Sequence, residues 1–174
     1  IELSDNSGDW GAYFIQTANI SFNADETQVD WDGDGTADWD AEDQKGFSPI
    51  GDAGFDDNFT GSYDGNEKTI SNLFINRPSD DYIGLFGGTD VATISNIGVI
   101  NVDITAPSDV GGLVGWNSGG NVSYSYTTGS VHAEYPGYGG YNVGGIVGQN
   151  TGTISNSYST VSVSGYSDIG GLVG

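Results

Sequence analysis

Four short glycine-rich boxes recur along this sequence, and they restrict the chain to a repeat architecture. The boxes read IGLFG at 83–87, VGGLVG at 110–115, VGGIVG at 143–148 and IGGLVG at 169–174. A second element alternates with them, as TISNLFIN at 69–76, TISNIGVI at 93–100, NVSYSYTT at 121–128 and TISNSYST at 153–160. A pair of elements that recurs in this way along a chain is the signature of a solenoid, in which each repeat packs mainly on its neighbours.

The alternating element predicts which side chains stack on one another. Short strand-like runs are broken by Gly, Asn or Asp, and no segment places apolar residues at helical spacing. We therefore predict parallel coils, with strands about 4.8 Å apart. One inward column should hold the first apolar residue of each element: Ile70, Ile94, Val122 and Ile154. A second should hold Asn72, Asn96 and Asn156, interrupted by Tyr124, while the insert 134–142 projects as a loop.

Charge and composition exclude several classes of protein. The chain has 174 residues, with 3 basic and 24 acidic side chains, for a net charge of −21. Such a polyanion repels nucleic-acid phosphates and anionic lipids. Without cysteine it forms no disulfide or thiolate metal site, and no apolar run of about 18 residues predicts a membrane span. A 36% hydrophobic content separates it from disordered acidic tails. Because the chain opens on Ile1 rather than Met, we expect a mature or excised piece of a longer protein.

The boxes and their paired strand elements resemble the GLUG motif, which recurs in large bacterial and archaeal surface proteins. The segments 12–22, 47–51 and 59–76 resemble the leader that commonly precedes such repeats. The sequence departs from the motif at IGLFG, which has one glycine fewer, and at Tyr124, where Asn is usual. The resemblance implies an all-β parallel β-helix, which we expect to be right-handed, in an extracellular or cell-surface setting. We expect one β-solenoid domain over 1–174, with N-terminal coils over 1–66, an acidic insert at 25–46 and GLUG-type repeats over 67–174.

The acidic insert carries the sharpest chemical signal in the sequence. Its run DWDGDGTAD at 30–38 matches the start of a calcium loop, with acidic residues at positions 1, 3 and 5, glycine at 6 and Asp at 9. We predict one calcium ion, bound by Asp30, Asp32, Asp34, the Thr36 carbonyl and Asp38. Position 12 is Ala41 instead of Glu, so another ligand must take that place. A second acidic group, which matches no template and favours a solvated surface, comprises Asp52, Asp56, Asp57 and Asp64.

Catalytic machinery is poorly represented. The single histidine, His132, aligns with Ser164 in the repeats, which indicates a surface position rather than a catalytic role. There is no HExxH zinc motif. The only cations, Lys45, Lys68 and Arg77, give no sign of convergence, although β-helix lyases commonly use such residues. We therefore predict that the chain is not an enzyme.

Tyrosines offer the remaining chemistry. We expect Tyr124, Tyr126, Tyr158 and Tyr166, which lie in the repeats, to serve mainly in packing. The insert that carries Tyr135, Tyr138 and Tyr141 favours an exposed contact surface, because tyrosine suits recognition surfaces and stacks on sugar rings. Three Asn-x-Ser/Thr sequons begin at Asn19, Asn58 and Asn121, and they matter only if the source organism glycosylates asparagine.

The sequence as a whole predicts a structural or adhesive module of an extracellular surface protein or fibre, made rigid by calcium. The alternatives are a carbohydrate-binding module that uses exposed tyrosines, or a polysaccharide-degrading β-helix with converging carboxylates in a groove. The last box ends at Gly174 without a following TISN-type strand. We therefore expect the solenoid ends to meet further repeats of the same chain or other copies, because uncapped coils template pairing. Cell-surface glycans are a further expected partner.

Overall fold

The computed structural model describes residues 7–22, 45–51, 57–134 and 140–174. In these ranges the protein is all-β apart from one short 3-10 helix, η1 (Ser7–Asp9). The strands are β1 (Tyr13–Ile15), β2 (Ile20–Ser21), β3 (Ser62–Ser71), β4 (Phe74–Asn76), β5 (Phe86–Asp90), β6 (Thr93–Ala106), β7 (Ser108–Gly111), β8 (Val114–Ser118), β9 (Asn121–Ser123), β10 (Tyr126–Ala133), β11 (Tyr141–Gly144), β12 (Val147–Asn150), β13 (Thr153–Ser155), β14 (Tyr158–Ser164) and β15 (Ile169–Gly170). Among the described residues no helix has the length and apolar character needed to cross a membrane.

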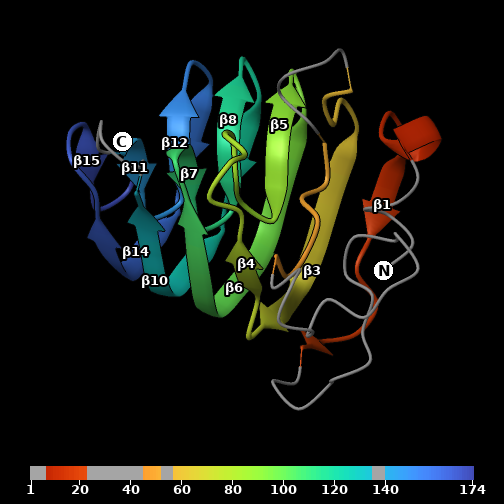
Figure 1. Ribbon diagram of the computed structural model, residues 1–174. Coiled ribbons are helices and arrows are strands. Elements are labelled where there is room, and N and C mark those ends of the chain that lie inside the picture. The colour runs from red at the N-terminus through yellow and green to blue at the C-terminus, as the bar shows by residue number, and fades with distance from the viewer. Residues whose placement is uncertain (1–6, 23–44, 52–56, 135–139) are drawn as a thin grey trace.

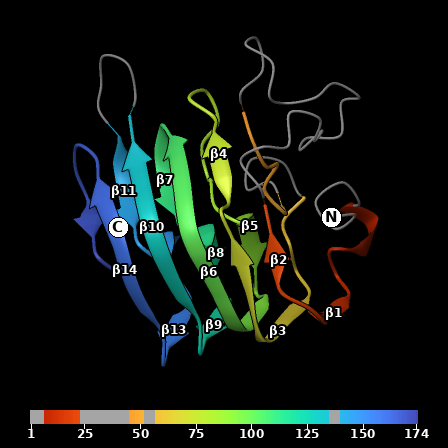
Figure 2. The same cartoon turned by 90° about the horizontal axis from the view of Figure 1, so that it is seen from below.

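The strands form a β-solenoid, as the repeats predict. It has about 3 turns. One sheet has the order β1-β3-β6-β10-β14, with β2, β4, β9 and β13 attached to it. Two smaller sheets have the orders β15-β11-β7 and β12-β8-β5. Every strand pair is parallel, and successive coils follow one another from the β3 side to the β15 side (Figures 1 and 2). The expected boundary at residue 66 falls inside β3.

The predicted column of apolar residues is correct for three of its four members. Val122 pairs with Ile94 of the preceding coil and with Ile154 of the next. The prediction for Ile70 is wrong, because Ile70 pairs with Val99 while Tyr63 takes the place beside Ile94. The backbone turns at Asn66 and Glu67, whose φ angles are 50° and 58°, and this corner moves the following TIS triplet further along the coil.

The asparagine column needs a matching correction. Ser123 pairs with Ser95 and Ser155, so Asn96, Tyr124 and Asn156 share one corner, with φ angles of 56°, 50° and 50°. Asn72 lies elsewhere, where its Oδ1 accepts a hydrogen bond of 2.7 Å from Asn101 Nδ2. Asparagine tolerates left-handed backbone better than most residues, which explains its recurrence at these corners.

The box glycines are required by close backbone approach. A Cβ on Gly111 would overlap the carbonyl oxygen of Val114, and it would lie 2.7 Å from the carbonyl oxygen of Ile146. The equivalent Gly144 and Gly170 meet the same obstacle three residues further along the chain. The last glycines of the boxes, Gly115, Gly148 and Gly174, lie against backbone of the neighbouring coil at the corners formed by Tyr82, Asp109 and Asn142. Each box is therefore a tight bend that accepts only glycine at these positions.

The interior is apolar and contains a hydrogen-bonded polar ladder. Phe59, Phe86, Leu113 and Ile146 are among the fully buried side chains. Inside the same stack, Thr89 Oγ1 donates to Asn117 Oδ1 at 2.9 Å, and Asn117 Nδ2 donates to Asn150 Oδ1 at 2.7 Å. Because the two buried side chains of this ladder, Thr89 and Asn117, have partners, the ladder fixes the register of three successive coils without an unsatisfied group.

At the N-terminal side of the core, Tyr63 links the first described coils. Its hydroxyl donates to Gln16 Oε1 at 3.0 Å, and the Gln16 amide nitrogen donates to the carbonyl oxygens of Ala18 and Thr69. Burial raises the pKa of the Tyr63 hydroxyl to about 12. The phenol thus stays neutral, and it stabilises the fold below pH 10, with that contribution lost as the pH rises toward 12.

Candidate binding site

The predicted calcium ligands Asp30, Asp32, Asp34, Thr36 and Asp38 lie outside the described residues, so the calcium site stays a prediction. Of the second acidic group, Asp64 takes part in packing. It accepts hydrogen bonds of 2.9 Å from Asn96 Nδ2 and from the backbone N–H of Asn66, and these lower the pKa of its carboxyl group. Within the ranges that the structure describes, no group of three or more acidic, His or Cys side chains is placed to hold a metal ion.

His132 lies at the surface position that the repeat alignment predicts. It pairs in register with Ser164, and its Nδ1 is 2.8 Å from Ser164 Oγ. Its Nε2 is 3.5 Å from a Glu134 carboxylate oxygen, and its side chain is 44% exposed. These contacts give His132 a role in joining neighbouring coils at the surface.

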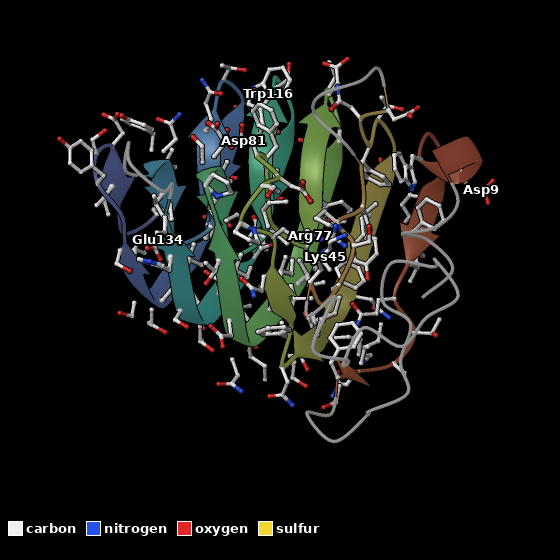
Figure 3. All side chains as sticks on the ribbon, viewed as in Figure 1. Asp9, Lys45, Arg77, Asp81, Trp116 and Glu134 are labelled. Atoms are coloured by element: carbon white, nitrogen blue, oxygen red, sulfur yellow. The ribbon has the colours of Figure 1, made fainter. Side chains whose placement is uncertain are left out.

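The segments that carry two of the three cations, Lys45 and Arg77, lie side by side. Residue 46 bridges to Ile75 in β4, and the backbone N–H of Asn76 donates to the carbonyl oxygen of Lys45 at 2.8 Å. This pairing brings the chain at Lys45 beside the chain at Arg77 (Figure 3). This contact concerns the backbone, so the expectation that the cations form no common site stays a prediction.

Arg77 borders a small hollow of about 140 Å³ beside the Tyr82 corner. The guanidinium donates to Asp80 Oδ2 at 3.4 Å and to the Phe47 carbonyl oxygen at 3.3 Å, while its buried Nη2 has no hydrogen-bond partner among the described residues. Burial, and then the charges of Asp109 and Asp80, raise the pKa of the Asp81 carboxyl group. Asp109 in turn accepts a 2.7 Å hydrogen bond from Asn142. Asn142 and Asp109 thus join neighbouring coils at this corner, and Arg77 holds the segment at Phe47.

The tyrosines of the repeats are more exposed than the sequence predicts. Tyr124 is 63% exposed, Tyr158 57% and Tyr166 72%, so none of the three packs in the core. Tyr126 is half-buried, and its ring stacks on that of Tyr158 with centroids 5.2 Å apart and planes 4° from parallel. Tyr141, from the insert, is 39% exposed and meets the Tyr166 ring edge-on. Tyr135 and Tyr138 lie outside the described residues.

Two of these rings border a surface hollow, which we call the Gly98 hollow. It has a volume of about 230 Å³ and is lined by Glu67, Lys68, Asn96, Ile97, Gly98, Tyr124 and Tyr126. Gly98 pairs with Tyr126 in the strand register. A Cβ on Gly98 would overlap the Tyr126 ring, so glycine is what allows the ring to lie across the strand of the coil beneath.

The polar residues of this hollow come from the corner between two coils. Lys68 follows the left-handed Glu67 and pairs with Ile97. The Asn96 amide is held by the Asp64 carboxylate. The sequence predicted neither Glu67 nor Lys68 as site residues, because aligning Ile70 with Ile94 places Lys68 at the wrong point of the coil. The signal that could have found them is Gly98, whose missing side chain makes room for an aromatic ring.

The fold and the boxes agree with a known motif. A model of the GLUG motif matches residues 106–131 and 139–164. Each match covers one turn of the solenoid, the first from the end of β6 to β10 and the second from before β11 into β14. This chain carries GLUG repeats. The GLUG box is thus the tight bend at Gly111 or Gly144. The GLUG strand element consists of β9 and β10 in one coil and of β13 and β14 in the next, and these strands pair as β9 with β13 and β10 with β14.

Two relatives of this chain are much longer than it is. Over 128 residues the chain is 40% identical to halomucin of Haloquadratum walsbyi, an alignment that covers 72% of this chain and 1% of halomucin. Over 75 residues it is 40% identical to a protein of Evansella cellulosilytica described as a Gly-rich membrane protein, covering 38% of this chain and 8% of that one. The chain therefore spans a small part of each relative. No solved structure matches it significantly.

Proposed function

We propose that this chain is a non-catalytic structural module of an extracellular or cell-surface protein, in which stacked GLUG coils form a stiff spacer. The ladder of Thr89, Asn117 and Asn150 supports this proposal, because it joins successive coils through the interior. The names of the relatives, halomucin and a membrane protein, favour the surface location. The carboxylates of Asp80 and Asp109 bind Arg77 and Asn142, which favours a structural part for these two groups. Right-handed winding stays part of the proposal.

Calcium would add rigidity at the acidic insert. Carboxylates at Asp30, Asp32 and Asp34 repel one another when confined, and a calcium ion converts this repulsion into cohesion. Asp38 and the Thr36 carbonyl would complete the set, with ligand oxygens about 2.3–2.6 Å from the ion. Millimolar extracellular calcium fills even a weak site of this kind.

The observation that carries the proposal is the state of the last described coil. Ile154, Val161, Val163 and Leu172 are only partly buried against the core. The counterparts of Ile154 and Val163 one coil earlier are Val122 and Val131, and both are fully buried. Within the described part of the chain, β14 pairs with β10 along one edge and with no strand along the other. We therefore propose that another coil, from further repeats or from a second copy, covers this surface and continues the stack.

Sedimentation velocity over a wide concentration range, in calcium buffer, tests this contact between copies. We expect the wild-type chain to associate, and Val163→Lys to stay monomeric, because a buried unpaired ammonium strongly opposes stacking. Ser162→Lys is the matched control, since Ser162 is exposed on the opposite side of the same strand. It adds the same charge and should associate like wild type. Identical sedimentation of the wild-type chain and Val163→Lys would contradict the proposal.

A further inference from the structure

Tyr124 has an unusual backbone for its residue type. Its φ angle is 50°, in the left-handed region, at the corner where the neighbouring coils have Asn96 and Asn156. Bulky side chains are strained there, as Tyr82 is elsewhere in this chain, and strained positions of this kind cluster at functional sites. The Tyr124 ring gains little from packing, because it is 63% exposed. The coil thus keeps a strained tyrosine where asparagine would fit better.

Lys68 is the second unexplained group at the Gly98 hollow. The chain has only 3 cations against 24 carboxylates. Even so, within the described ranges the Lys68 ammonium has no hydrogen-bond or ion-pair partner. Glu67 beside it adds a carboxylate. The hollow therefore offers an ammonium donor together with carboxylate and amide oxygen acceptors, beside two aromatic rings.

This combination fits a sugar ring. Tyrosine faces carry negative charge density that attracts the C–H groups of a pyranose, while the hydroxyls at its rim both donate and accept hydrogen bonds. The volume of about 230 Å³ lies below the range of pockets that enclose drug-sized ligands, which start near ~300 Å³. One ring therefore fits, with the rest of a glycan outside. The net charge of −21 opposes the approach of anionic sugars.

We propose that the Gly98 hollow is a binding site for one pyranose ring of a neutral glycan. The exposed ring of Tyr124 contacts the C–H face of the sugar, the rim of Tyr126 borders the sugar, and Lys68, Glu67 and Asn96 bind its hydroxyls. Gly98, by lacking a side chain, makes room for the Tyr126 ring at the edge of the hollow. This site goes beyond the structural role proposed above and depends on neither calcium nor the contact at the last coil.

The test is an NMR titration of the whole chain with three probes: methyl glucopyranoside, methyl galactopyranoside and methyl mannopyranoside. For at least one probe we expect chemical-shift changes confined to the Gly98 amide, the Asn96 side chain and the Tyr124 and Tyr126 rings. The Kd should lie in about the millimolar range. Tyr124→Asn should weaken binding by about tenfold or more. The same variant should melt no lower than wild type, because asparagine suits this corner.

Tyr166→Asn is the matched control. It removes a tyrosine that is 72% exposed and does not line the hollow, and it should leave binding unchanged. If none of the three pyranosides shifts these signals, or if Tyr124→Asn binds as well as wild type, the site does not exist as described. Tighter binding of methyl glucuronide than of the three neutral probes would overturn the assignment to a neutral sugar.

Discussion

Gly111→Ala should destabilise the protein by about 3 kcal/mol or more, enough to prevent folding of a marginally stable chain. The added methyl would overlap the carbonyl oxygen of Val114, and it would lie 2.7 Å from the Ile146 carbonyl oxygen and 2.8 Å from the Gly148 nitrogen. All three atoms belong to the backbone of two stacked coils, so no side chain can rotate away. Urea denaturation followed by circular dichroism measures the loss.

The control for this prediction lies in another glycine box. A Cβ on Gly171 meets nothing within 4 Å, so Gly171→Ala should change stability by no more than about 0.5 kcal/mol. Gly145→Ala changes the same box position one coil earlier, where the methyl would overlap the Gly171 carbonyl oxygen, and it should be strongly destabilising. Equal losses for Gly145→Ala and Gly171→Ala would show that coil stacking does not restrict the boxes.

Calcium should raise the melting temperature by several degrees. If Kd is about 100-fold below the free calcium concentration, binding stabilises the native state by about 2.7 kcal/mol. For a chain of this length that corresponds to roughly 5–10 °C. Asp32→Asn should abolish most of the shift, because it removes the charge of a central ligand. Asp90→Asn is the charge-matched control, at an exposed position at the end of β5, and should retain the shift.

Calorimetry with calcium and melting in a chelator decide this prediction together. Absence of binding heat, combined with an unchanged melting temperature in chelator, would reduce the insert to a solvated acidic loop. Such a result would leave the coils untouched, because every contact described above between β3 and β15 joins groups of the chain itself.

The sequence predicts the coils well where the same residue types recur at the same distance from a corner of the backbone. Val122 lies between Ile94 and Ile154 because each is followed by the same serine and then by a left-handed corner residue. The glycine boxes are equally informative, since their spacing reports a bend that excludes a Cβ. Both signals are local and recur at a matching place in each coil.

The same letters mislead at Ile70. TISN at 69–72 has the same sequence as TISN at 93–96. Strand register, however, depends on where the chain turns and not on this local sequence alone. The corner at Asn66 and Glu67 comes before the TIS triplet at 69–71. The residues of the triplet itself do not reveal this corner. Tyr63, an aromatic residue, therefore fills the place beside Ile94 where a second isoleucine was expected.

The Gly98 hollow was beyond prediction for the same reason. Its tyrosines were visible in the repeats, but their exposure depends on which coil faces them. The register shifts between Thr127 and Gly129, and again between Asp64 and Lys68, and such irregularities have no simple sequence signature. Only the folded stack brings Lys68 of one coil beside Tyr124 and Tyr126 of another.

Methyl NOE spectroscopy on the Ile- and Val-labelled protein tests the central claim, that GLUG coils stack in this parallel register. Strands about 4.8 Å apart bring stacked side chains into contact. We expect cross-peaks from Val122 to Ile94 and to Ile154, and from Ile70 to Val99. Cross-peaks from Ile70 to Ile94 without any to Val99, or the absence of contacts between Val122 and Ile154, would contradict the stack described here.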